Sequence, residues 1–223
     1  MSDTLTDLRR RIKTTDDLRA VVKTMKAMSA ASITPFEQAV DSLRDYFRTV
    51  ELALSVCMTT TEMDVVELTQ HDSALPSGFL VHGTDQGMVG QFNEYLVEDA
   101  VQRIKDTGTA PIIWAIGERV QLRLENEGLS VIQTFPTPSS VTAITPLVTE
   151  LLLEMQSCRE REEVGPIFQL HNRPIIRGTY EPQLTSLLPL DAQWRQRIAS
   201  VPWPTKFLPE MIAGDPNDLA SMI

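Results

Sequence analysis

Hydrophobic positions follow a helical period through the first quarter of the chain. An upstream stripe consists of Leu8, Ile12, Leu18, Val22 and Met25. From Phe36 the steps alternate between four and three residues, as in a coiled-coil seam, through Phe36, Val40, Leu43, Phe47, Val50, Leu54 and Cys57. The two stripes differ in phase, which predicts a stutter near residue 30. Together they predict helix from about Asp3 to Met58.

One local signal conflicts with an uninterrupted helix. Thr34 is suited to cap a helix that has Pro35 at its first position and Glu37 at its third, as in a capping box. Propensity alone would divide the segment into two helices here, whereas a proline kink within one long helix is the other option.

The pattern changes after a polar gap at 59–77. Short apolar runs predict strands at 78–83, 110–117, 129–135, 165–174 and 175–182. Amphipathic segments between them predict helices at 93–108, 118–128 and 141–159. This alternation is typical of a Rossmann-like α/β domain with a mostly parallel sheet, and the last two strands are expected to form an antiparallel edge hairpin.

Three regions follow from these patterns. We expect an N-terminal coiled-coil helix at 1–60, an α/β domain at 61–190, and an irregular segment at 191–223 that contains four prolines. Asp215, Pro216 and Asp218 form a good helix start near its end, but the sequence stops about two turns later.

The overall charge restricts the class of partner. A formal charge of −10 and a pI near 4.8 argue against nucleic-acid binding and against an anionic membrane surface. The N-terminal end is locally basic, with Arg9, Arg10, Arg11, Lys13, Arg19, Lys23 and Lys26. That end is suited to an acidic protein surface, although an ordinary solvated helix face explains the charge equally well.

No targeting or redox signal is evident. Cys57 and Cys158 are far apart and form no CxxC motif, which fits a reducing cytoplasm. The polar N-terminus does not resemble a signal peptide, and no run reaches the ~18 apolar residues of a membrane span. We therefore expect a soluble cytoplasmic protein without direct membrane insertion.

A glycine-rich stretch, "VHGTDQGMVGQFNEYL" at 81–96, is the strongest candidate for chemistry. Its G-xxx-G-xx-G spacing differs from a dinucleotide fingerprint, and Gln91 and Phe92 follow the last glycine where a Walker loop has Lys and Ser or Thr. The glycines allow positive φ, and Asn93 is placed to cap the next helix. We therefore predict a structural or partner-facing turn rather than a phosphate loop.

Other catalytic patterns are absent from the sequence. It has no G-x-S-x-G elbow, no HExxH and no suggestive pair of carboxylates. The three histidines, His71, His82 and His171, are dispersed, and each is expected to be a surface or strand-end residue. We expect no catalytic residue, no metal and no cofactor.

The order of these features resembles one family. "LRRRIKTTDDLRAVVKTMKAMSAAS" at 8–32 resembles the opening helix of the γ subunit of F-type ATP synthases. "GTDQGMVGQFN" is similar to that family's glycine loop, and "FQLHNRPIIRGTYEPQLTSLLPL" is similar to a later hairpin. The loop positions in register are Asp85, Gly87, Gly90, Phe92 and Asn93.

The resemblance implies the role of a central-stalk rotor, without a catalytic site of its own, in an ion-transporting ATP synthase. The implied partners are the α and β subunits of the catalytic ring, the ε subunit and the c-ring, at the cytoplasmic face of a bacterial inner membrane. It implies coupling contacts with β subunits at Lys23, Met25, Lys26 and Met28. Asp85, Gly87, Gly90 and Asn93 would form a structural loop at the foot of the stalk.

The resemblance also implies a C-terminal helix that completes the coiled coil, and that helix is missing from this sequence. The chain is therefore expected to be a truncated product or a fragment. The subunit is expected to belong to an alternative bacterial ATP synthase. Two other functions remain open: a free-standing coiled-coil adaptor and a small nucleotide-binding α/β protein.

Overall fold

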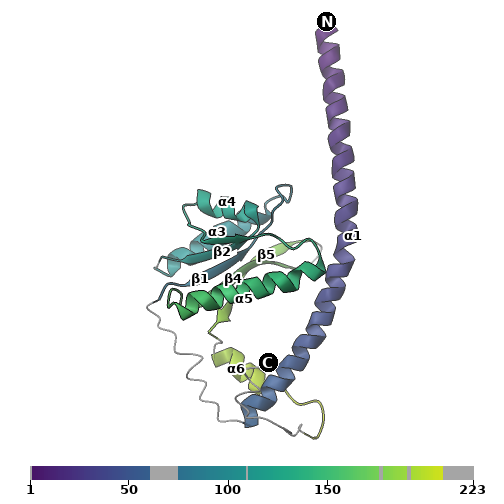
Figure 1. Ribbon diagram of the computed structural model, residues 1–223. Helices are drawn as coiled ribbons and strands as arrows, with labels where there is room; N and C mark the ends of the chain where they lie inside the picture. Colours follow the sequence, from purple (N-terminus) through teal and green to yellow (C-terminus); the bar gives the residue numbers. More distant parts are fainter. Residues whose placement is uncertain (1, 61–74, 109, 176–177, 190–191, 208–223) are drawn as a thin grey trace. The chain divides into compact units, whose positions relative to one another are not determined.

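The computed structural model describes residues 2–60, 75–108, 110–175, 178–189 and 192–207 (Figure 1). The chain divides into two compact units, Met1–Thr49 and Val50–Ile223. This boundary lies inside the first helix. The expected helix start at Asp215 lies outside the described residues.

The first helix, α1, runs without interruption over Ser2–Thr60, with Pro35 inside it. The prediction of helix over 3–58 is confirmed, and the division into two helices at Thr34 is wrong. Pro35 has no backbone N–H, so the carbonyl four residues earlier has no partner within the helix. Because this helix is exposed to solvent, water can bond to that carbonyl, and the helix can continue through the proline. Several hydroxyl side chains bond back to the carbonyl four residues earlier, including Thr24 to Ala20 and Ser32 to Met28.

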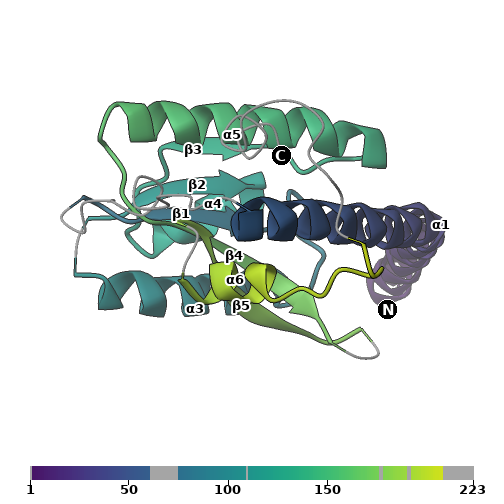
Figure 2. The same cartoon turned by 90° about the horizontal axis from the view of Figure 1, so that it is seen from below.

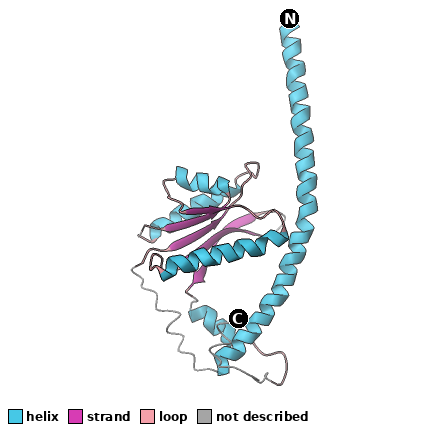
Figure 3. Ribbon diagram, in the orientation of Figure 1, coloured by secondary structure: helices cyan, strands magenta, loops and turns pink. Residues whose placement is uncertain are grey.

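The strands, drawn in magenta in Figure 3, form one five-stranded sheet in the order β3-β2-β1-β4-β5. Strands β1 (Gly78–His82), β2 (Ile112–Ile116), β3 (Gln133–Phe135) and β4 (Ile167–Pro174) pair in parallel. Strand β5 (Tyr180–Leu188) pairs with β4 in the antiparallel sense. The predicted Rossmann-like domain with a mostly parallel sheet and an antiparallel edge is confirmed.

Helices cover both faces of the sheet (Figures 1 and 2). On one face, α3 (Phe92–Asp106) and α4 (Glu118–Asn126) bury a cluster that includes Phe79, Val81 and Leu96. On the other, α5 (Ile144–Glu160), preceded by a 3₁₀ turn at Val141–Ala143, packs over Trp114 and Phe135. Side chains of β1 alternate between the two clusters, as the two-residue period of a strand requires.

The second strand of the hairpin begins later than predicted. The expected strand at 175–182 is replaced by β5 at Tyr180–Leu188. The amide of Ile175 donates to the carbonyl of Thr179, and Gly178 has a positive φ of 78°, so these residues precede the strand instead of forming its beginning.

A short helix, α6 (Ala192–Ala199), lies in the segment that the sequence predicted to be irregular. It lies next to the end of α1: Arg197 is 3.6 Å from Glu51, and the Ser55 hydroxyl donates to the carbonyl of Val201. Ile198 is fully buried. Within the described part of the chain, no helix has the length and hydropathy that a membrane span requires.

Candidate functional site

The glycine loop begins directly after β1 and is organised by Asp85. One carboxylate oxygen accepts the backbone amide of Glu118 at 2.8 Å. The other accepts the backbone amide of Thr137 at 2.8 Å and also the Thr137 hydroxyl. Because Glu118 follows β2 and Thr137 follows β3, a single carboxylate connects the carboxyl ends of three parallel strands.

These bonds also define the electrostatics of the loop. Partial burial raises the pKa of the Asp85 carboxyl, but the hydrogen bonds from Thr137 and from the Glu118 amide lower it, and the net pKa lies below its ordinary value. Glu118 is the first residue of α4, so Asp85 places a negative charge at the positive end of that helix. A phosphate bound at the same helix end would be repelled by this carboxylate.

Asn93 connects helix α3 to Thr84, near the start of the loop. Its side-chain oxygen accepts the amide of Thr84 at 3.1 Å, and its amide nitrogen donates to the Thr84 hydroxyl at 2.9 Å. The predicted role of Asn93 as a helix cap is wrong, because α3 begins at Phe92 and its cap residue, Gln91, makes no side-chain cap bond. Asn93 is already inside the helix, so its buried side chain is free to bind the loop instead.

The glycines of the loop have unequal roles. Gly90 has a φ of 62°, as predicted from the composition of the turn. Gly87 has no positive φ, and a Cβ there would make only ordinary contact with Arg119. Gly83 leaves no space for a side chain, because a Cβ there would lie 2.2 Å from the Cβ of Val120. Outside the loop, Gly117 has a φ of 109°, and a Cβ would lie 2.6 Å from the Thr84 carbonyl carbon.

A shallow depression of about 330 Å³ lies beside the loop. Its wall includes Arg119 and an ion pair of 2.6 Å between Arg123 and Glu94. Glu94 lies in the first turn of α3, where a phosphate site would need an unoccupied helix end. The arrangement therefore favours the structural-turn interpretation over nucleotide binding.

The four residues expected to form coupling contacts lie on α1, within the first compact unit. Met25 is half-buried, and Lys23, Lys26 and Met28 are exposed. At 3.6 residues per turn, Lys23 and Lys26 lie about 60° apart on one side of the helix, and Met25 and Met28 lie about 60° apart on the other. The structure therefore separates the cationic pair from the apolar pair.

Two histidines that the sequence left dispersed come together in the sheet. His82, at the end of β1, is the register partner of His171 in β4, and their ring centroids are 6.4 Å apart. The signal was present in the sequence, because "FLVH" and "FQLH" place a histidine at the same position of two apolar strands. Only the pairing of β1 with β4 makes these positions neighbours.

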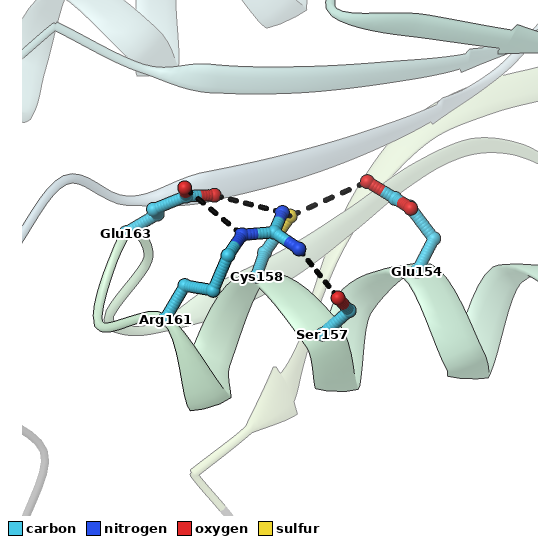
Figure 4. Close-up of polar contacts among 5 residues, drawn as sticks. All are labelled: Glu154, Ser157, Cys158, Arg161 and Glu163. Atoms are coloured by element: carbon cyan, nitrogen blue, oxygen red, sulfur yellow. Dashed lines mark hydrogen bonds and ion pairs between the residues drawn. The ribbon is translucent and has the colours of Figure 1, made fainter.

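Cys158 is buried near the end of α5, among the polar side chains shown in Figure 4. Its thiol donates to Glu154 at 3.4 Å, and Arg161 lies 3.4 Å from the sulfur while bonding Glu163 at 2.9 Å. Burial, followed by the hydrogen bond to Glu154, raises the pKa of the thiol to about 11. A thiol with a raised pKa is mostly protonated at neutral pH and is therefore a weak nucleophile.

Comparisons with known proteins identify the family. A family model described as ATP synthase matches residues 4–215. The ATP synthase gamma chain of Alkaliphilus metalliredigens is 23% identical over 193 residues, which is 84% of this chain and 64% of the relative. That of Persephonella marina is 21% identical over 84% of this chain and 65% of the relative. The chain belongs to the ATP synthase gamma family.

A solved structure shares the fold. A chain in the central stalk and c-ring of the Tetrahymena thermophila mitochondrial ATP synthase aligns with a TM-score of 0.50 and 14% identity. The alignment covers 74% of this chain and 71% of that one. The present chain spans less than two thirds of the length of the two curated relatives.

Proposed function

We propose that this chain acts as the central-stalk rotor subunit of an F-type ATP synthase. Rotation would couple ion translocation to ATP synthesis or hydrolysis at the catalytic β subunits. The observation that carries the proposal is the family match over residues 4–215, because it includes both the long helix and the α/β domain. The proposed partners are the α, β and ε subunits and the c-ring, at the cytoplasmic face of a bacterial inner membrane.

The surface of α1 supports this role. Apolar side chains of its first unit lie open to solvent, with Leu8 at 59%, Leu18 at 61% and Leu43 at 62% of their full exposure. A stripe of this kind gains stability when another helix or a surrounding ring covers it. The chain itself would supply no catalytic residue, and its rotation would change the nucleotide affinity of each β subunit in turn.

The cationic pair and the apolar pair on opposite sides of α1 support two different kinds of contact. We expect Lys23 and Lys26 to contact acidic loops of the β subunits, and Met25 and Met28 to contact apolar surface on the opposite side. The loop of Asp85, Gly87, Gly90 and Asn93 would shape the domain at the foot of the stalk without binding nucleotide.

The test is reconstitution of the 223-residue chain with the α and β subunits of its source organism. We expect a stable complex that hydrolyses ATP. The double variant Lys23→Glu/Lys26→Glu should lower that hydrolysis by about tenfold or more, because like charges would then face each other at the interface. Arg48→Glu, an exposed charge reversal elsewhere on α1, is the matched control and should have little effect. A chain that does not associate with α and β would overturn the proposal.

A further inference from the structure

His82 and His171 form a pair that the stalk function does not require. They are register partners on the adjacent parallel strands β1 and β4, so both side chains lie on the same face of the sheet. The ring centroids are 6.4 Å apart and the ring planes are inclined by 73°. This separation is too long for a direct hydrogen bond between the rings, which would bring the centroids to about 5 Å.

Each ring carries a buried nitrogen without a protein partner. Nε2 of His82 and Nδ1 of His171 are both buried, and neither makes a hydrogen bond to any residue that the structure describes. Buried polar atoms are normally bonded, so two such atoms on neighbouring side chains call for an explanation. Burial and the proximity of His171 lower the pKa of His82 to about 4, and burial together with Arg173 lowers the pKa of His171. Both rings are therefore neutral near pH 7, the form in which imidazole binds a metal.

The pair also lies at a position where open α/β sheets bind ligands. In the order β3-β2-β1-β4-β5, the chain passes from β1 outward to β2 and β3 and then returns to the other side of β1 as β4. The direction of strand order changes between β1 and β4, and ligands bind outside the carboxyl ends of the strands at such a point. His82 is the last residue of β1.

The ring separation fits one ion held between two imidazoles. With metal–nitrogen bonds of about 2.0–2.1 Å, each ring centre lies about 3 Å from the ion. Two rings on opposite sides of an ion, as in a square-planar Cu²⁺ site, are then about 6 Å apart, close to the observed 6.4 Å.

We propose that His82 and His171 together bind a divalent transition-metal ion. Imidazole nitrogens select Cu²⁺, Ni²⁺ or Zn²⁺ over Mg²⁺ or Ca²⁺, and Cu²⁺ should bind most tightly. No group of three or more metal-binding side chains occurs among the described residues. Water would therefore complete the coordination, so the ion should exchange readily.

The experiment uses the complete 223-residue chain and Cu²⁺ or Zn²⁺ as the probe. Since Cys158 is buried and protonated, it should not compete for the metal. We expect His82→Gln and His171→Gln each to weaken Cu²⁺ binding about tenfold or more. His71→Gln removes the remaining histidine and is the matched control, so it should leave the affinity unchanged. Equal Cu²⁺ affinity in all three variants would overturn the proposal.

A second measurement keeps the test valid if a variant fails to fold. In the wild-type chain labelled with ¹⁵N-histidine, Zn²⁺ should shift the imidazole resonances of two of the three histidines. Zn²⁺ should also raise the melting temperature, as any ligand of the folded state does. Zn²⁺ that shifts one imidazole, or none, at millimolar concentration would contradict a shared site.

Discussion

The carboxylate of Asp85 accepts the backbone amide of Glu118, 33 positions later in the chain, at 2.8 Å. This bond connects the turn after β1 to the first residue of α4. The same side chain also bonds Thr137 beyond β3. The loop resembles a ligand site in the sequence, but in the structure the Asp85 carboxylate of the protein itself is bound to these backbone amides.

Replacing this carboxylate should destabilise the α/β domain. We expect Asp85→Asn to lower the free energy of unfolding by about 1–3 kcal/mol, because charge-assisted bonds to two amides are lost or weakened. Urea denaturation would measure the change. Asp106→Asn, at the exposed end of α3, should change stability by less than about 0.5 kcal/mol. Equal stability of the two variants would show that the Asp85 bonds contribute nothing.

The sign of the pH effect follows from the lowered pKa of Asp85. A carboxyl with a lower pKa in the folded state stabilises the protein above its unfolded pKa, and this stability is lost as pH falls through the folded pKa. The contribution of Asp85 should therefore be present at neutral pH and should disappear below about pH 4. The stability difference between wild type and Asp85→Asn should shrink over that range.

Alanine substitutions at two glycines should lower stability by different amounts, because only Gly117 combines a positive φ with no space for a Cβ. Gly117→Ala forces a Cβ to 2.6 Å from the Thr84 carbonyl carbon at a φ of 109°, so we expect a loss of about 2 kcal/mol or more, or failure to fold. Gly87→Ala should be tolerated within about 1 kcal/mol, because a Cβ there meets Arg119 at ordinary contact distance. Thermal unfolding of both variants would test this ranking, and a larger loss in Gly87→Ala would contradict it.

The elements of this fold were largely readable from the sequence because each is specified locally. Strand and helix periods placed β1, β2, α3, α4 and α5 within a few residues of their observed bounds. Pro35 was misleading because its capping box is also a local signal, and a continuous helix prevailed over it. The hairpin was misplaced because Ile175, which continues the apolar run of β4, bonds to Thr179, and β5 begins only at Tyr180.

The contacts of the loop could not be read in the same way. The bond between Asp85 and Thr137 joins residues 52 positions apart, and the meeting of His82 with His171 depends on which strand β4 pairs with. Asn93 had the residue type of a cap, but α3 begins at Phe92 with Gln91 as its cap residue, and Asn93 binds Thr84 instead. Each of these contacts depends on how separate segments come together in the fold, and local sequence patterns do not show this.

His82 should make the folded state sensitive to acid. Its pKa is about 4 in the folded protein and 6.5 at the ordinary value, so the unfolded chain binds a proton first as pH falls. Stability from this group is complete above about pH 6.5 and declines down to pH 4, by up to about 3 kcal/mol. His82→Gln should flatten urea stability over this range, whereas His71→Gln should retain the slope. An unchanged slope in His82→Gln would refute the assignment.

Cys158 should resist alkylation in the folded protein. With a pKa of about 11, roughly one thiol in a thousand is ionised at pH 8, and the sulfur is buried as well. In a Cys57→Ser background, labelling by iodoacetamide should therefore be slow and should accelerate when urea unfolds the domain. A control chain with Cys57→Ser, Cys158→Ser and Gln156→Cys places the thiol at an exposed position of the same helix and should react rapidly. Equal rates in the two folded chains would mean that Cys158 is accessible, and the network with Glu154 and Arg161 would then not shield it.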